Sequence, residues 1–356
     1  MDSTTACTLD CPDVCSLLAS TRDGRLKVRP NPDHPFTRGF ACAKVQRHLK
    51  QAFGPERITE PLLRDGGGFR PVCWDEALDW AAQRIQALRD TPEAVLHLRG
   101  HGYRGVLARA STAFFGRLGA STTRGSLCDE AGIAAQIRDF GELDHNDPED
   151  LVNARRIVLF GRDLPACSIH THKLVLEARK AGARVLVVSP GADHNGELPD
   201  QRILLRPGAD RFLAAAALKV LFEAGGVPER AQAAAANVEG LLAELDRWSV
   251  AELCAAAGAA PADAEALAGW YAGDEPASTL IAWGLQRYEH GAENVRFIDA
   301  LCALSGQMGR PGATANFNIG SARNLGPWPG GLGQPARALL LPRLAEELER
   351  AEPPVE

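Results

Sequence analysis

The chain has 356 residues, of which 45% are hydrophobic and 24% charged, the balance of an ordinary globular protein. This length accommodates two domains, or one large α/β domain with an appendage. The formal net charge of −6 and the lack of any Lys/Arg-rich block argue against a nucleic-acid partner, and no apolar run reaches the roughly 18 residues of a membrane-spanning helix.

The first 58 residues are predicted to form a small cluster-binding module. Strand-like runs at 16–20 and 26–29 lie between turn signals. Three cysteines follow one another closely and a fourth comes much later: Cys7, Cys11, Cys15 and Cys42. Four thiolates are the ligand set of a [4Fe–4S] cluster, and a tight loop with a later turn can approach a cubane from two sides.

Zinc and unliganded thiols are the alternatives to an iron–sulfur cluster at these cysteines. Zinc also binds four sulfurs, but its sites usually consist of two short C-x₂₋₄-C pairs. A disulfide framework needs an oxidising compartment, and the N-terminal residues lack the basic start, apolar core and twin arginine of an export signal. A cytoplasmic location and an iron–sulfur cluster are therefore expected.

From residue 61 onward the pattern predicts helices alternating with strands. A helix is expected to begin near Trp74, with Asp75 as its N-cap. The remaining strands are predicted at 94–98, 157–160, 185–189, 203–205 and 280–283, and the remaining helices at 106–118, 169–180, 210–224 and 292–304. Apolar strands joined by helices are typical of a parallel sheet covered on both faces, with ligands at the carboxyl ends of the strands.

The predicted fold class is therefore α/β, with a small N-terminal [4Fe–4S] module followed by a doubly wound, mostly parallel, Rossmann-like sheet domain. The alanine-rich residues 225–275 are expected to be helical, 320–335 irregular because of their glycines and prolines, and 336–351 a last amphipathic helix. The predicted division is 1–58 for the cluster module, 59–319 for the α/β region, and 320–356 for an irregular linker with the terminal helix.

Short motifs in a characteristic order accompany this pattern. They are L-D-C-P-D-V-C-S at 9–16, D-H-P-F-T-R-G-F-A-C-A-K at 33–44, W-D-E-A-L-D at 74–79, G-S-L-C-D-E-A-G at 125–132, R-I-V-L-F-G-R at 156–162, R-V-L-V-V-S-P at 184–190, L-R-P-G-A-D at 205–210, G-L-Q-R-Y-E-H-G at 284–291 and S-G-Q-M-G-R-P-G at 305–312. In these motifs the chain resembles the molybdopterin oxidoreductase family, of the dimethyl-sulfoxide reductase and formate dehydrogenase type. The resemblance implies a bis(molybdopterin guanine dinucleotide) cofactor with molybdenum or tungsten.

The resemblance also implies roles for two residues near the redox centres. Lys44 matches a lysine that lies between cluster and pterin and links them electronically; the alternative is a solvated surface lysine. Cys128 matches the residue that ligates molybdenum or tungsten, where a thiolate is a soft, strongly donating ligand. The alternative for Cys128 is a buried structural cysteine.

The cofactor-binding residues implied by the resemblance follow the predicted strands, namely Gly161, Arg162, Asp163, Ser189, Gly208 and Asp210. The turn at Gly161 would bring backbone amides to a pyrophosphate, and Asp210 would accept hydrogen bonds from guanine or cap the following helix. The chain departs from the family at two places, because Arg162-Asp163 replaces Asn-Pro and Ser189 replaces an aspartate. His101 follows the first strand of the α/β region, from where it could reach a substrate, whereas the spacing of His170 and His172 at i and i+2 is not that of a metal site.

The sequence thus predicts an oxidoreductase chain in which a small-molecule substrate reacts at the metal and electrons leave through the cluster. The alternative is a cluster-bearing electron-transfer or scaffold chain that lacks the metal–pterin cofactor. A zinc-bearing interaction module is a third reading. Members of the family are longer than this chain, so a complementary chain, supplying the C-terminal half or transferring electrons, is expected as a partner.

Overall fold

The computed structural model describes residues 2–9, 11, 13–22, 24–100, 106–143, 145–191, 193–317 and 326–356. Contacts divide the chain into two compact units. The first comprises Met1–Asp10, Val14–Gly125 and Ser321–Glu356, and the second comprises Cys11–Asp13 and Ser126–Gly320. The division predicted from the sequence groups residues by the cofactor that they would bind, and these units group residues by contact, so the predicted division stays a prediction.

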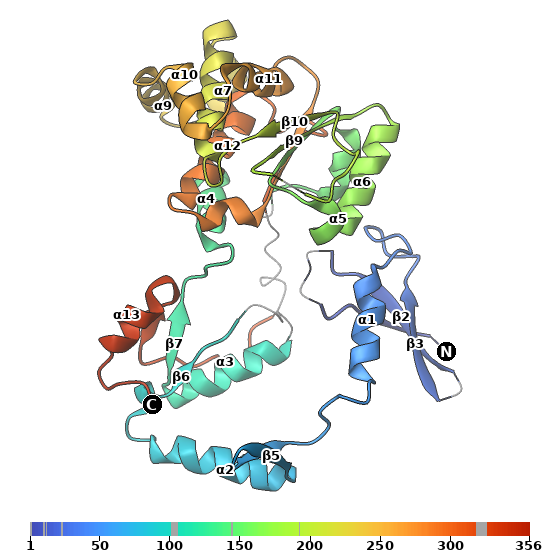
Figure 1. Cartoon of the computed structure of the whole chain (residues 1–356), viewed down its shortest axis with the longest axis vertical. Coiled ribbons are helices and arrows are strands. Elements are labelled where there is room, and N and C mark those ends of the chain that lie inside the picture. The colour runs from blue at the N-terminus through green and yellow to red at the C-terminus, as the bar shows by residue number, and fades with distance from the viewer. Residues whose placement is uncertain are drawn as a thin grey trace. The chain divides into compact units, whose positions relative to one another are not determined.

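The N-terminal part of the first unit is an antiparallel sheet with the order β1-β2-β3, followed by a helix. The bounds are β1 Ser3–Ala6, β2 Ser16–Arg22, β3 Arg25–Pro30 and α1 Ala43–Ala52 (Figure 1). The strands confirm both runs predicted here. A small core of Cys15, Leu17 and Val45 lies beneath the sheet, with Cys7 packed against it. The cysteines Cys15 and Cys7 are therefore part of the small apolar core of this module.

The rest of the first unit is a β-hairpin, two longer helices and a small parallel sheet with the order β13-β7-β6. The bounds are β4 Leu62–Asp65, β5 Gly68–Pro71, α2 Trp74–Ala87, η1 Pro92–Ala94, β6 Leu96–His97, α3 Val106–Leu118, β7 Ser121–Arg124, β13 Ala338–Leu340, η5 Leu341–Arg343 and α13 Leu344–Glu349. Helix α2 begins at Trp74 as predicted, but the Sγ of Cys73 caps it by accepting from Glu76 N at 3.5 Å. The prediction of Asp75 as N-cap was wrong.

The predicted C-terminal helix at 336–351 was also wrong over its first half. Ala338–Leu340 instead forms β13, which pairs in parallel with β7 in the register Ala338↔Thr122. Pro342 follows, and because proline lacks an amide hydrogen and fixes its φ, it separates the strand from the helix. The helix is therefore reduced to α13.

The second unit is built on a five-stranded, fully parallel sheet with the order β10-β9-β8-β11-β12. Its strands are β8 Arg156–Phe160, β9 Arg184–Ser189, β10 Gln201–Leu204, β11 Ala277–Ile281 and β12 Ala315–Asn316. The chain starts at β8, builds outward to β10, and then returns to the other side of β8 with β11. The strand order therefore reverses beside β8, and this is where open α/β sheets bind ligands at their carboxyl ends.

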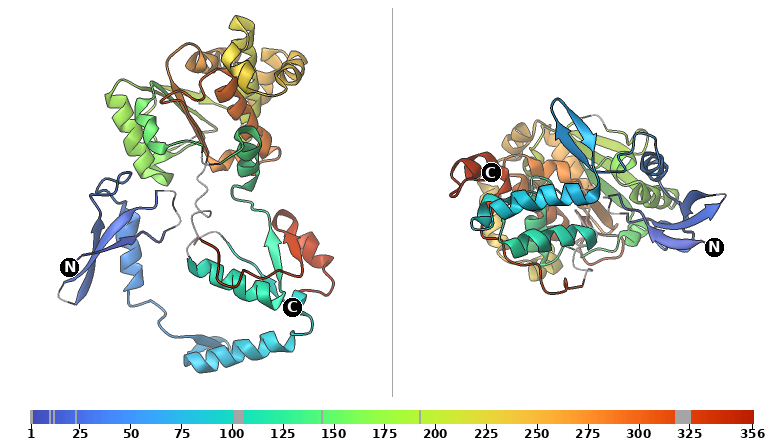
Figure 2. Two further views of the ribbon diagram at one scale, coloured as in Figure 1. Left: turned by 180° about the vertical axis from the view of Figure 1, so that it is seen from behind. Right: turned by 90° about the horizontal axis from the view of Figure 1, so that it is seen from below.

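Helices cover both faces of this sheet (Figures 1 and 2). Helices α5 Leu164–Cys167 and α6 Ile169–Lys180 lie on one face, and α4 Glu130–Phe140, α7 Asp210–Gly225 and α12 Gly291–Leu304 on the other. Side chains along β8 point alternately to the two faces of the sheet. Val158 and Phe160 belong to the core around α7, and Ile157 and Leu159 are fully buried on the other face. The α/β prediction is confirmed.

The alanine-rich segment after α7, expected to be helical, forms four short helices, and the described residues of the unit also include the 3₁₀ helices η2 and η3. Their bounds are α8 Glu229–Ala234, α9 Val238–Asp246, α10 Val250–Ala257, α11 Pro261–Tyr271, η2 Pro148–Asn153 and η3 Trp283–Arg287. In the part of the chain that the structure describes, no helix combines the length and apolar character needed to cross a membrane.

Candidate functional site

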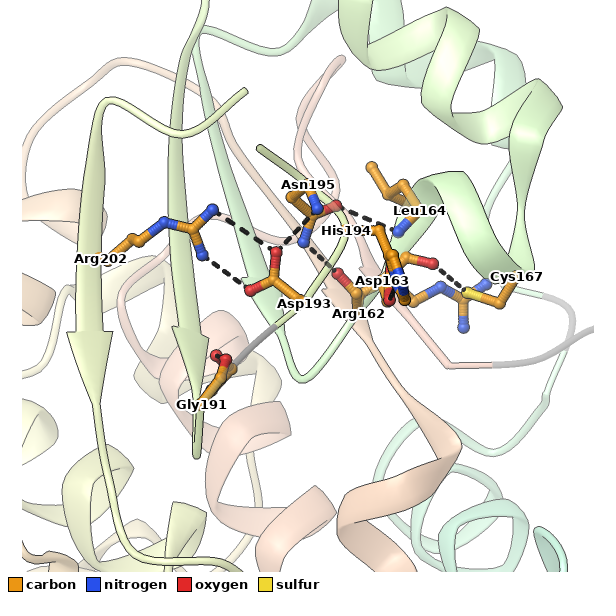
Figure 3. Close-up of polar contacts among 10 residues, drawn as sticks. Arg162, Asp163, Leu164, Cys167, Gly191, Asp193, His194, Asn195 and Arg202 are labelled. Carbon is orange, nitrogen blue, oxygen red and sulfur yellow. Dashed lines mark hydrogen bonds and ion pairs between the residues drawn. The ribbon is translucent and has the colours of Figure 1, made fainter. Parts of the chain in front are cut away.

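A pocket of about 410 Å³ opens at the carboxyl ends of β8 and β9 in the second unit. Its lining residues are Gly161, Arg162, Asp163, Ser189, Pro190, Gly191, Asp193 and Pro207. Four of the six cofactor-binding residues expected from the sequence thus lie around one cavity. Figure 3 shows polar contacts of the lining residues Arg162, Asp163 and Asp193 with their neighbours.

Gly161 makes the turn that leads from β8 into α5. Its φ of +60° lies in the left-handed region, which glycine reaches without strain. Its own N–H donates to Val188 O at 2.8 Å, so this amide is already used by the sheet. Any backbone donors for a phosphate would have to come from the residues after Gly161.

Arg162 and Asp163 each have one buried polar atom without a partner among the described residues. Arg162 Nη1 donates to Ile281 O at 3.3 Å and Nη2 to Ser168 Oγ at 2.9 Å, while Nε has no partner. Asp163 Oδ2 contacts His194 Nδ1 at 2.6 Å, while Oδ1 has none. Buried polar atoms are normally paired. One unpaired donor and one unpaired acceptor on two residues that line the same pocket fit a ligand that carries both kinds of group, as a nucleotide does.

The loop at 193–196, which was not singled out from the sequence, contacts the segment that carries Arg162 and Asp163. Asn195 accepts from Leu164 N at 3.1 Å and donates to Arg162 O at 2.9 Å, and Asp193 pairs with Arg202 at 2.7 Å (Figure 3). The hydrogen bond to Asp163 raises the pKa of His194, whose side chain is largely exposed. The turn signal D-H-N-G at 193–196 could have drawn attention to this loop.

Gly208 and Asp210 are not among the residues that line the pocket, although Pro207 is. A Cβ on Gly208 would lie 2.7 Å from Cγ of Tyr288, so the packing of Tyr288 accounts for this glycine. Asp210 is the first residue of α7, after the N-cap Ala209, so it does not occupy the N-cap position. It is buried, and burial raises its pKa to about 6. Its contact with guanine stays a prediction.

Cys128 lies just before α4 and is held by η3. Arg287 Nη2 donates to its Sγ at 3.3 Å and Arg287 Nε to its carbonyl at 3.0 Å. Gln286 Nε2 donates to the same carbonyl at 2.7 Å. The thiol is half-buried and is not part of a packed core, which fits a ligand position better than a structural one. Arg287 and Gln286 belong to a motif noted above, but their contact with Cys128 could not be read from the sequence.

Three of the four N-terminal cysteines are close enough to influence one another. Burial raises the pKa of the Cys7 thiol, and the charges of Cys15 and Cys42 raise it further. Cys7 N also donates to Cys15 O at 2.8 Å. Thiolates that repel one another are stabilised by bound cations, so the donor chemistry fits a metal cluster. Cys11 belongs to the segment Cys11–Asp13, which groups with the second unit.

None of the nine cysteines, all of which are described, forms a disulfide. Within the described ranges, no three His, Cys, Asp or Glu side chains surround a single-ion position. Lys44 lies exposed at the start of α1, and its role between cluster and pterin stays a prediction. His101 lies outside the described residues.

Comparisons with known proteins agree with these features. Residues 57–347 match the family model described as "Molybdopterin oxidoreductase", and residues 3–52 match "Molybdopterin oxidoreductase Fe4S4 domain". The "Probable oxidoreductase YyaE" of Bacillus subtilis (strain 168) is 34% identical over 317 residues, covering 88% of this chain and 47% of that protein.

Two further comparisons are more distant. The assimilatory nitrate reductase catalytic subunit of Bacillus subtilis (strain 168) is 24% identical over 78% of this chain and 40% of its own. Acetylene hydratase from Pelobacter acetylenicus shares the fold with a TM-score of 0.70 at 18% identity, covering 86% of this chain and 44% of that one. The chain therefore spans about half the length of these relatives. On the match over residues 57–347 and the identity with the first relative, the chain belongs to the molybdopterin oxidoreductase family.

Proposed function

We propose that this chain is part of an oxidoreductase that binds a bis(molybdopterin guanine dinucleotide) with molybdenum or tungsten and a [4Fe–4S] cluster. The observation that carries the proposal is the pocket at the carboxyl ends of β8 and β9. Arg162 and Asp163 both line this pocket, and each keeps one buried polar atom without a partner among the described residues. A dinucleotide arm offers phosphate oxygens to the first and base or ribose donors to the second.

The chain's own residues would bind and orient the cofactors. Cys7, Cys11, Cys15 and Cys42 would hold the cluster, and Lys44 would lie between the two centres. Cys128 would supply a thiolate to the metal, fixed in place by Arg287 and Gln286. When bound, the metal–pterin group supplies the two-electron chemistry, and the cluster passes electrons on singly.

The substrate is proposed only as a small molecule. A cysteine at the metal-ligand position favours formate, nitrate or sulfur-compound chemistry, and one relative is named a nitrate reductase. The cytoplasmic location expected from the sequence also stays a prediction.

The alternative is a chain that retains the cluster and has lost the metal–pterin cofactor. One observation favours it: Ser189, which stands where the family usually has an aspartate, donates its hydroxyl to Gly191 O at 3.0 Å. This hydroxyl is engaged within its own loop, so it does not replace the carboxylate acceptor. The described contacts of Cys128 favour the first function, because a scaffold has no need of a thiol clamped by arginine.

Metal analysis after anaerobic purification, with any co-purifying chain kept, separates the two functions. The proposed enzyme should contain iron together with molybdenum or tungsten, and acid hydrolysis should release guanine. Iron without molybdenum, tungsten or guanine would establish the alternative. Zinc without visible absorption would contradict both.

A further inference from the structure

A buried carboxylate–imidazole pair lies beside the cysteine-rich segment, in the second unit. Asp13 Oδ2 contacts His170 Nδ1 at 2.8 Å, and these side chains are only 3% and 1% exposed. The same oxygen also accepts a hydrogen bond from the backbone N–H of His170 at 3.4 Å, in the first turn of α6. In the sequence, Asp13 stands between Cys11 and Cys15, two of the expected cluster ligands.

Burying a carboxylate and an imidazole is energetically unfavourable unless the polar atoms of both side chains form hydrogen bonds. A carboxylate near the first turn of a helix is stabilised by the helix dipole and by backbone N–H groups. Removing one partner leaves the other buried and unpaired, which is more unfavourable than exposing both. The pair therefore holds residue 13 in one place, although this residue belongs to a short loop without secondary structure.

The same helix start also contacts the nucleotide pocket. Ser168 precedes α6, is 1% exposed, and accepts from Arg162 Nη2 through its Oγ at 2.9 Å. Its carbonyl accepts from His172 N at 2.8 Å, so the first turn of α6 fixes its position. The start of α6 thus binds the cysteine-bearing segment through His170 and a pocket residue through Ser168.

We propose that Asp13 and His170 are positioning residues for the iron–sulfur cluster. By fixing Asp13, two residues after Cys11, the start of α6 restricts the position of Cys11 and presents it in the conformation that binds iron. The inference rests on the proposed [4Fe–4S] cluster, and it assigns a function to an aspartate and a histidine that are not themselves expected cluster ligands.

The test measures cluster retention in the full chain, purified anaerobically with any co-purifying chain. The variants are Asp13→Ala, His170→Ala and the double variant, with His172→Gln on the same helix as the matched control. Iron release to an excess of chelator and the EPR spectrum of the reduced cluster are recorded, and circular dichroism checks the fold. Each single alanine variant should release iron about tenfold faster than the wild type, as expected for the loss of one buried charge-assisted hydrogen bond.

Two comparisons distinguish positioning from a general loss of stability. The double variant should release iron no faster than either single variant, because both remove the same contact. Asp13→Asn keeps the shape and one acceptor oxygen, so it should stay within about threefold of the wild type and restore the wild-type EPR spectrum. If the alanine variants do not fold, Asp13→Asn and His170→Phe, which keeps a ring but offers no donor, are compared with the control by the same two readouts, and a wild-type spectrum and release rate in His170→Phe would overturn the inference.

The experiment distinguishes a failure of the proposed cluster from a failure of the role proposed for Asp13 and His170. A wild-type protein without iron would contradict both the proposed function and the inference. A wild-type protein with its cluster, and alanine variants that match its spectrum and release rate, would overturn the inference alone. Equal acceleration in His172→Gln would overturn it too, because any change in α6 would then have the same effect.

Discussion

At the scale of single residues, Asp210 is the carboxyl group whose burial has the clearest consequence. It is 3% exposed at the start of α7, and burial raises its pKa from 3.8 to about 6. The folded state therefore binds more protons than the unfolded state between these two values. Stability contributed by this group is present at low pH and is lost as the pH rises through about 6.

Asp210→Asn should reveal this dependence. The variant cannot ionise, so its free energy of unfolding should rise relative to the wild type as the pH increases from about 4 to about 6. The difference should total about 3 kcal/mol and be flat at higher pH. Urea unfolding at several pH values measures it, with the exposed Asp79→Asn on α2 as control. A difference that does not change with pH would contradict the burial of an ionisable Asp210.

Some site residues could be predicted because they follow directly from strand ends. Gly161, Arg162, Asp163 and Ser189 stand where apolar strands stop, and a parallel sheet brings such positions together. The pair of Asp13 with His170 could not be predicted, because it joins positions far apart in the sequence. For the same reason the clamp of Arg287 on Cys128 was not foreseen.

At the scale of elements, the turn between β8 and α5 connects three parts of the second unit. Arg162 in this turn donates to Ile281 at the end of β11 and to Ser168 before α6. The strands β8 and β9 and the helices α6, α7 and α12 were predicted to within one residue, because their apolar patterns are clear, whereas β11 was predicted three residues too late and β12 was not predicted. The C-terminal segment was not, because the run at 338–340 pairs with the distant β7, and helical periodicity cannot show such pairing.

Arg162→Ala should weaken nucleotide binding to the pocket. The change removes the cation of a residue that lines the proposed phosphate site, so the affinity for GDP, used as a probe of the dinucleotide arm, should fall about tenfold. Isothermal titration calorimetry on apo-protein measures it, and Arg247→Ala, a mostly exposed arginine paired with Glu244 on α9, serves as control. Equal affinity in Arg162→Ala and the wild type would remove Arg162 from the proposed site.

At the scale of the whole molecule, helix α2 is unusual because it has no buried residue. Trp74 and Leu78 are 67% and 59% exposed on this helix, and Phe69 of the preceding hairpin is 63% exposed. Neighbouring exposed aromatic and aliphatic side chains usually mark an interaction surface. On these exposed side chains we propose that a complementary polypeptide binds this surface.

Charged substitutions on α2 should abolish that association. Trp74→Glu combined with Leu78→Glu places two carboxylates in the apolar surface, where burial against a partner would be strongly unfavourable. Size-exclusion chromatography and co-purification should show the wild type associated and the double variant as a single chain, with Asp79→Lys on the same helix behaving like the wild type. A wild type that remains a fully active monomer would contradict the partner proposal.

The central claim is that one polypeptide holds an iron–sulfur cubane on its N-terminal cysteines and a molybdenum or tungsten cofactor beyond them. EPR spectroscopy of protein kept strictly anaerobic tests it most directly. The account predicts a reduced-cluster signal of about one spin per chain and, at intermediate potential, a separate Mo(V) or W(V) signal. Colourless, EPR-silent protein in which Cys7, Cys11, Cys15 and Cys42 all react readily with an alkylating reagent would contradict it.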